Sequence, residues 1–137
     1  MAKYNESAEN YLETILMLSK KLPVVRSVDI ATELGFKKSS VSVAMKNLKE
    51  KEHITVTDAG FIYLTDSGRR IAEMIYERHE ILTSCLKTLG VDAAVAEEDA
   101  CKIEHVISEE SFQALKRAVH ELREQQESAK EDAADQA

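Results

Sequence analysis

The sequence predicts a mainly α-helical protein with one short β-hairpin. Apolar residues recur at helical spacing in six separate stretches of the 137-residue chain. Between the third and fourth stretches lie two runs of β-branched and aromatic residues, separated by a glycine-containing turn. The composition, 44% hydrophobic and 31% charged, is ordinary for a globular protein, and the length suits one domain or two small ones that share a core.

The first helix is expected over residues 7–22. Ser7 is suited to cap its N-terminus, with Asn10 three residues on. Pro23, the only proline, ends the segment because its ring cannot continue a helix. The apolar stripe consists of Tyr11, Leu12, Ile15, Leu16 and Leu18.

Two further helices, 27–34 and 38–51, form a helix-turn-helix. Ser27 is suited to cap the first of them, and Gly35 ends it at a position that favours left-handed backbone. A short turn containing a glycine is typical of this motif. The start and outer side of the second helix carry lysines and short hydroxyls, which suit phosphates and base edges of DNA. The candidate DNA-contacting residues are Ser27, Lys37, Lys38, Ser39, Ser40, Ser42, Lys46 and Asn47. A helical hairpin without DNA-binding function is the alternative.

A hairpin follows, and then the chain returns to helix. Residues 53–57 and 61–64 predict two strands joined by the turn at residues 58–60, which places a wing after the recognition helix. The next helix is expected over residues 66–86, with its N-terminus capped from the segment 65–68, and Gly90 closes it.

The helix expected over residues 91–107 carries the candidate metal ligands. Cys101, Glu104 and His105 lie three and four residues apart, so they share one face, and Glu97 lies one turn earlier on that face. A thiolate, a carboxylate and an imidazole together suit a first-row divalent ion. The alternative is a small buried cysteine beside a solvated Glu-His pair.

The last helix is expected from Ser108 to about residue 125. Ser108 is suited to cap it, and acidic residues follow in its first turn. Beyond residue 125 the apolar pattern stops, so a disordered tail is expected over 126–137. The predicted domains are therefore residues 1–70, with the helix-turn-helix and wing, and residues 71–125, a helical metal-binding and dimerisation domain.

Charge is distributed unevenly along the chain. The net charge is -7, yet residues 20–51 hold 8 basic against 3 acidic side chains, and residues 71–137 hold 7 against 16. A basic front and an acidic back suit a DNA-binding part joined to a part that binds cations. The two cysteines, and an N-terminus without a signal-peptide core, favour a reducing cytoplasm. Neither a bilayer-spanning run nor a nucleophile–base set is evident, so no membrane association and no enzymatic activity are expected.

In combination, these motifs resemble the diphtheria-toxin-repressor family of metal-dependent transcriptional repressors, which includes the manganese-transport regulators. The resemblance covers about residues 7–123 and looks like the short form that lacks an SH3-like domain. The matching motifs are Asn10-Tyr11-Leu12-Glu13-Thr14-Ile15, Asp29-Ile30-Ala31, Ser40-Val41-Ser42, Leu64-Thr65 with Gly68, Arg78-His79 and Glu104-His105.

The resemblance implies a set of metal ligands. Cys101, Glu104 and His105 look like the main site, and Asn10 stands where the family has an Asp or Met ligand. Glu13 and His79 look like ligands of a second, neighbouring site, and Glu97 falls where iron-type members have another ancillary ligand, a histidine. Asn10 departs from the pattern because an amide oxygen is a weaker donor than a carboxylate.

The resemblance also implies a homodimer that binds Fe(II) or Mn(II) and represses metal-homeostasis genes at palindromic operators on double-stranded DNA. The donor chemistry itself favours Fe(II), Co(II), Ni(II) or Zn(II) over Mn(II). No small-molecule substrate other than the ion is expected. The dimer interface is expected at the apolar surplus of Ile81, Leu82, Val95, Ile103 and Val106. Two alternatives are a metal-independent winged-helix regulator and a metalloenzyme.

Overall fold

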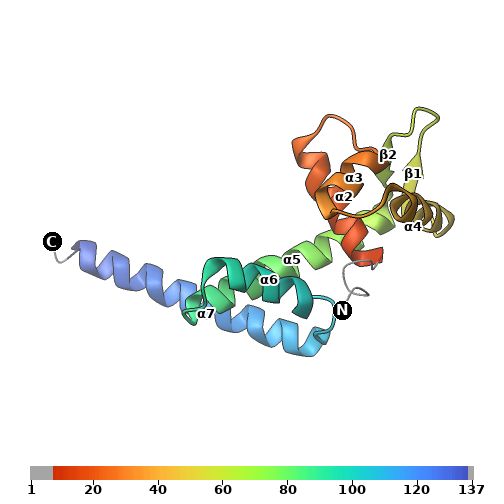
Figure 1. The fold of residues 1–137 in the computed structure, drawn as a ribbon. Helices are drawn as coiled ribbons and strands as arrows, with labels where there is room; N and C mark the ends of the chain where they lie inside the picture. The colour runs from red at the N-terminus through yellow and green to blue at the C-terminus, as the bar shows by residue number, and fades with distance from the viewer. Residues whose placement is uncertain (1–7, 136–137) are drawn as a thin grey trace. The chain divides into compact units, whose positions relative to one another are not determined.

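A computed structural model describes residues 8–135 of the chain, and in this range the protein consists of helices and one two-stranded sheet (Figure 1). The expected cap Ser7 lies outside the described residues. The contacts divide the chain into two compact units, residues 1–76 and 77–137. The elements in order are α2 (Ala8–Lys21), α3 (Ser27–Leu34), α4 (Lys38–Glu50), β1 (Ile54–Val56), β2 (Ile62–Leu64), α5 (Asp66–Thr88), α6 (Ala93–Ile103) and α7 (Glu109–Asp135). The predicted fold class, mainly α with a winged helix-turn-helix, is confirmed.

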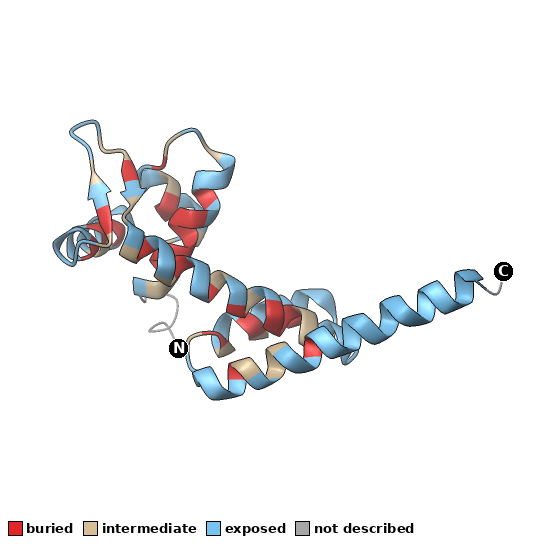
Figure 2. Ribbon diagram, turned by 180° about the vertical axis from the view of Figure 1, so that it is seen from behind, coloured by how far each residue is buried: buried red, intermediate tan, exposed pale blue. Residues whose placement is uncertain are grey.

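The first unit has a single hydrophobic core to which each of its elements contributes. Leu12 and Ile15 of α2, Ile30 of α3, Val41 of α4 and Ile54 of β1 are all at most 2% exposed. They lie at the helical and strand spacings that the sequence displays. In Figure 2 the buried segments of this unit lie on the inward faces of its helices, and the outer faces are exposed. The core therefore fixes α3 and α4 as a helix-turn-helix.

The ends of α3 are set by its flanking residues. Its N-cap is Arg26, whose backbone N–H donates to the Asp29 carboxylate at 2.9 Å, so Ser27 is the first helical residue rather than the expected cap. The Asp29 carboxylate at the third helical position explains the shift, because it satisfies the preceding N–H itself. Gly35 ends the helix with φ 68°, a conformation in which a side chain is unfavourable.

The wing is joined to the rest of the first unit at its base. β1 and β2 pair antiparallel, and the Ile62 N–H donates to the Val25 carbonyl at 2.8 Å, which links the wing to the α2–α3 loop. Gly68 lies against the residue before β1: a Cβ at this position would be 1.9 Å from the backbone oxygen of His53. Only glycine permits this approach, and Thr65 Oγ1 accepts the Gly68 N–H at 3.2 Å to cap α5 as expected.

The second unit contains the end of α5 together with α6 and α7. A smaller cluster of Ile81, Phe112 and Val119 joins α5 to α7, with Cys85 and Ile107 packed against it, and the buried residues of α6 are Ala96 and Ala100. Here α6 ends at Ile103, earlier than the expected residue 107, and a turn leads to α7. Ser108 caps α7 as expected, since its Oγ accepts the Ser111 N–H at 3.1 Å.

The residues expected to be disordered after about Gln125 are helical up to Asp135, and this is a correction. All of α7 from His120 onward is exposed, as Figure 2 shows for its outer part. An apolar stripe is not needed to extend a helix that is already nucleated, and Glu, Gln, Ala and Lys are strong helix formers. Among the described residues, no helix has the length and apolar character to cross a membrane.

Candidate metal centre and DNA-facing surface

Three potential metal ligands converge in the second unit. They are His79 on α5, Cys101 in the last turn of α6, and Glu104, which caps the C-terminus of α6. One ligand atom from each residue lies within 4.8 Å of those of the other two. The helical spacing between Cys101 and Glu104 brings those two together, and the packing of α5 against α6 adds the histidine.

Glu104 is at the centre of the cluster and is only 1% exposed. Its Oε2 lies 3.0 Å from His79 Nδ1, and its Oε1 lies 3.3 Å from His105 Nε2. The Sγ of Cys101 lies 3.7 Å from the same His79 Nδ1, and this cysteine is exposed. The carboxylate is therefore buried between two imidazoles, and the thiol forms the solvent side of the cluster.

The neighbours of His79 favour its protonated form. Its hydrogen bond to Cys101, followed by that to Glu104, raises its pKa from 6.5 to about 10, although burial opposes the shift. A proton therefore occupies the point where these donors converge. A divalent cation could replace that proton, because nitrogen, sulfur and carboxylate oxygen are all ligands of first-row divalent metals. The donor set thus fits a transition-metal ion.

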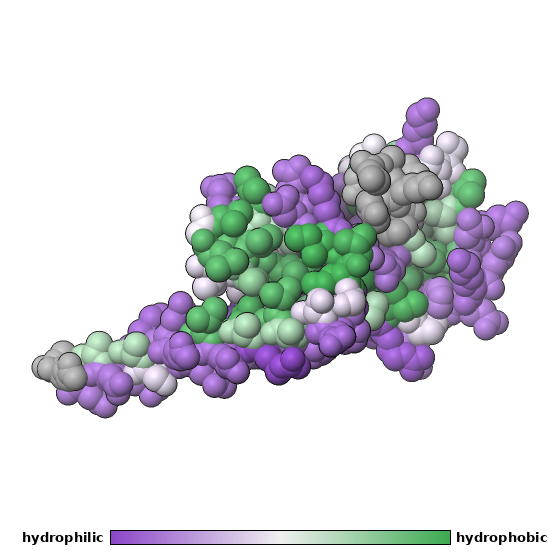
Figure 3. Space-filling view, turned by 90° about the horizontal axis from the view of Figure 1, so that it is seen from below, coloured by the Kyte–Doolittle hydropathy of each residue, from purple (hydrophilic) through white to green (hydrophobic). Residues whose placement is uncertain are grey.

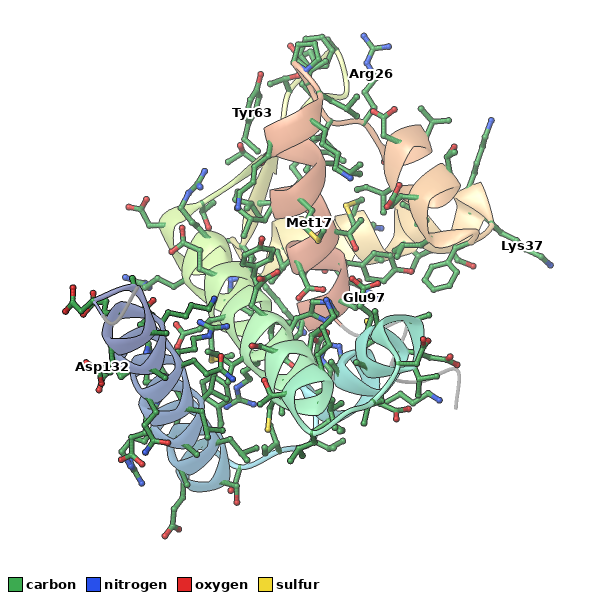
Figure 4. All side chains as sticks on the ribbon, turned by 90° about the vertical axis from the view of Figure 1, so that its left-hand side faces the viewer. Met17, Arg26, Lys37, Tyr63, Glu97 and Asp132 are labelled. Atoms are coloured by element: carbon green, nitrogen blue, oxygen red, sulfur yellow. The ribbon has the colours of Figure 1, made fainter. Side chains whose placement is uncertain are left out.

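The structure brings together predicted ligands that the family resemblance assigns to two neighbouring sites. His79, expected in a second site, lies with Cys101 and Glu104, and His105 faces the other oxygen of the same carboxylate. Glu97 is exposed, and together with His79 it lines a pocket of about 270 Å³. The other residues that line this pocket are Glu80, Thr83, Ser84, Lys87 and Arg123. Figure 4 labels Glu97 on α6.

Asn10 and Glu13, the other two predicted ligands, lie on α2 in the first unit. Glu13 is only 7% exposed, an unusual degree of burial for a carboxylate, and Asn10 is half-buried. Three residues separate them, so they lie on one face of the helix.

The predicted DNA-contacting residues form an exposed surface at the start and outer side of α4. Lys37, Lys38, Ser39, Ser40, Ser42, Lys46 and Asn47 are exposed, and Ser27 on α3 is partly so. In Figure 4 the Lys37 side chain points away from the ribbon. The core contains none of Lys37, Lys38, Ser39 and Ser40, so their side chains are available to a partner.

Arg26 is a candidate DNA contact that the sequence analysis missed. Its guanidinium lies 4.9 Å from the centre of the Phe61 ring, so it is held beside the wing, and Figure 4 shows its tip pointing outward. Tyr63 on the wing is 48% exposed. Spacing could not reveal Arg26, because the contact joins segments that are far apart in the sequence.

The exposed apolar residues of the second unit differ partly from those expected at a dimer interface. Ile81 and Leu82 are buried within the chain at 7% and 3% exposure, and Ile81 packs with Phe112 and Val119 of α7. Val95 and Val106 are exposed as expected, at 46% and 59%. Figure 3 shows apolar side chains gathered near the point from which the largely hydrophilic outer part of α7 extends.

Two family models together match nearly the whole chain. Residues 3–59 match the N-terminal DNA binding domain of the iron dependent repressors, and residues 65–132 match their metal binding and dimerisation domain. These matches describe transcriptional regulators rather than enzymes, in agreement with the sequence-based expectation.

Individual relatives agree with these matches. The transcriptional regulator MntR of Escherichia coli O157:H7 is 32% identical over 115 residues, which cover 84% of this chain and 74% of MntR. MntR of Salmonella typhimurium is 32% identical over 114 residues, which cover 83% of this chain and 73% of that protein.

Solved structures show the same fold. A manganese-dependent transcriptional repressor in complex with manganese has a TM-score of 0.77 at 26% identity, over 83% of this chain and 53% of that one. IdeR of T. acidophilum has a TM-score of 0.73 at 26% identity, over 82% and 53%. This chain thus spans about half the length of these solved relatives. From the two domain matches and the curated relatives together, the chain belongs to the iron dependent repressor family of metal-dependent transcriptional repressors.

Proposed function

We propose that this protein is a repressor that a divalent metal ion activates, with His79, Cys101, Glu104 and His105 as the main ligands. The observation that carries the proposal is the convergence of an imidazole nitrogen, a thiol and a buried carboxylate within 4.8 Å. A buried carboxylate beside a histidine whose pKa is raised to about 10 has its negative charge balanced by a proton. A divalent metal ion at that position would supply a larger positive charge than the proton does.

The donor chemistry supports iron as the ion sensed in the cell, with manganese as the second candidate. Thiolate and imidazole ligands favour Fe(II), Co(II), Ni(II) or Zn(II), whereas Mn(II) prefers oxygen. The curated relatives are named MntR, and one solved relative is a manganese-dependent repressor in complex with manganese. Zn(II), Co(II) and Ni(II) are expected to bind in vitro. Asn10, Glu13 and Glu97 are proposed as further ligands on the family resemblance.

The DNA partner is proposed to be a palindromic operator of metal-homeostasis genes, bound by a homodimer in the cytoplasm. The exposed lysines and hydroxyls of α4 suit phosphates and base edges. A dimer with twofold symmetry presents two such helices, so its operator would be symmetric as well. The exposed Val95 and Val106, in the domain that matches the dimerisation model, support a self-association surface.

Within the proposed activation, each residue has a distinct task. Glu104 supplies a negative charge from a buried position, His79 releases its proton from Nδ1, and Cys101 binds as the thiolate. The ion supplies a positive charge that these groups hold in one arrangement. It can act as a switch only if the DNA-binding form binds the ion more tightly than the inactive form.

The test is DNA affinity as a function of metal. The probe is a duplex selected from a random-sequence library by the Fe(II)-loaded protein under anaerobic conditions. We expect Fe(II) or Mn(II) to raise the affinity and a chelator to reverse the effect. Equal affinity with metal and with chelator would favour the metal-independent regulator. A monomeric mass at micromolar concentration with metal present would contradict the dimer.

A further inference from the structure

A buried arginine lies immediately before the histidine of the candidate metal centre. Arg78 on α5 is only 8% exposed, and its guanidinium stands over the Phe112 ring with its central carbon 5.5 Å from the ring centre. Buried arginines are rare unless they are paired. The role of Arg78 therefore depends on what its nitrogen atoms bind.

The guanidinium joins three segments of the second unit. Nη1 donates to the backbone carbonyls of Glu104 and Ile107, each at 3.1 Å, and Nη2 donates to the Glu109 carboxylate at 2.9 Å. The two carbonyls belong to the end of α6 and the turn that follows it, where a helix leaves its last carbonyls without partners. Glu109 begins α7. One side chain of α5 thus fixes the turn that contains Glu104 and His105.

Adjacent residues of α5 therefore hold the two ends of Glu104. Arg78 binds its backbone carbonyl, and His79 binds its carboxylate through Nδ1 at 3.0 Å. Because Glu104 is 1% exposed, little solvent can replace a lost partner. A shift of the turn would move the carboxylate away from Cys101 and His79 together.

We propose that Arg78, with Glu109 as its partner, is a positioning residue that sets the geometry of the metal centre. This inference rests on the proposed function for its metal-binding consequence. Arg78 does not touch the ligand atoms. It acts through the backbone of the Glu104 turn, and its planar fork is suited to serve three acceptors at fixed angles.

The geometry separates the expected effects of two substitutions. Arg78→Lys keeps the charge but replaces the fork by one ammonium group, which cannot reach all three acceptors in the same directions. Glu109→Gln removes only the exposed arm of the network, because the Glu109 side chain is 63% exposed. Glu110→Gln is the matched control for it, and Arg117→Lys is the control for the arginine, since both residues are exposed on α7.

The experiment uses Co(II) as the probe with the full chain. The affinity for Co(II), and the thiolate-to-cobalt charge-transfer band, are measured for the wild type and the four variants. Arg78→Lys is expected to lose about 10- to 100-fold in affinity, as for other residues that orient metal ligands, and to shift the band. Glu109→Gln should lose less, and the two controls should match the wild type. A folded Arg78→Lys protein with wild-type affinity and spectrum would overturn the proposal.

Amide hydrogen exchange, measured without metal, tests the positioning role of Arg78 independently of the proposed metal binding. Amide exchange of Val106 and Ile107, whose N–H groups both donate to the Ile103 carbonyl at 3.0 Å, reports the order of the turn. Exchange should be faster in Arg78→Lys and Glu109→Gln than in the controls. If Arg78→Lys does not fold, wild-type exchange and Co(II) affinity in Glu109→Gln would refute the positioning role. If the wild type binds no Co(II), the proposed function fails, and the exchange rates still decide the role of Arg78.

Discussion

Replacing each of the two cysteines separates metal binding from stability. Cys101 is exposed at the solvent side of the candidate metal centre, whereas Cys85 is partly buried and packs against the cluster of Ile81, Phe112 and Val119. Cys101→Ala should therefore shift the metal response to a much higher metal concentration and leave the fold intact. Cys85→Ala should do the reverse, lowering stability and leaving the metal response unchanged.

The magnitudes follow from these environments. A structural zinc site contributes about 10–16 kcal/mol from four ligands, so the loss of one donor costs about 3 kcal/mol, or roughly 100-fold in affinity. Loss of an exposed side chain changes the free energy of unfolding by about 0.5 kcal/mol or less. Truncation of the half-buried Cys85 thiol removes part of a packed cluster and should cost about 1 kcal/mol.

The assay pairs two curves for each protein. Operator affinity is measured against Fe(II) and Mn(II) concentration under anaerobic conditions, and metal-free unfolding is followed in urea. Cys101→Glu should recover a response and move its preference toward Mn(II), because all donors are then oxygen or nitrogen. Superimposable metal curves for wild type, Cys101→Ala and Cys101→Glu would refute the assignment of Cys101 as a ligand.

Three further predictions concern the DNA surface, protonation and the backbone. Lys46→Ala should weaken DNA binding and reduce the slope of log affinity against log salt by about 0.9, because one phosphate contact is lost; an unchanged slope would mean that this face of α4 does not meet DNA. The pKa of His79 is raised from 6.5 to about 10, so its contribution to the stability of the metal-free protein is complete below pH 6.5 and is lost as pH rises through 10. Urea midpoints of wild type and His79→Gln should therefore converge between pH 6.5 and 10, and a gap independent of pH would contradict this. Glu52 has φ 63°, so Glu52→Gly should stabilise the protein by about 1 kcal/mol in the same unfolding assay, whereas Glu50→Gly, within α4, should destabilise it.

The fold could largely be predicted because its elements are set by local patterns. The apolar spacing of α2, the glycine after α3 and the turn between β1 and β2 each act within a few residues. The two wrong predictions concern helix ends, which depend on interactions that the apolar spacing does not reveal. Asp29 caps α3 from inside the helix, and α7 continues beyond its last buried residue, Val119.

The metal centre could be predicted only in part for the same reason. Helical spacing brings Cys101 and Glu104 together, but it cannot tell that His79, 22 residues earlier, completes their cluster. The burial of Glu104 likewise depends on α5 and on the turn before α7. Arg78 did leave a signal: it falls at the helical spacing of the apolar positions Ile75 and Leu82, where a charged residue requires buried partners.

The outer part of α7 can unfold independently of the rest of the second unit. Arg123 still donates to Ser84 Oγ of α5 at 2.7 Å, but none of the described residues beyond it is buried, so hydrophobic burial contributes little to keeping that part helical. A helix of this length held by propensity alone is marginal in water, and its turns open with a free energy near zero. Proteases would therefore reach the bond after Lys130 without any unfolding of the rest of the second unit, and the metal centre would survive that cut.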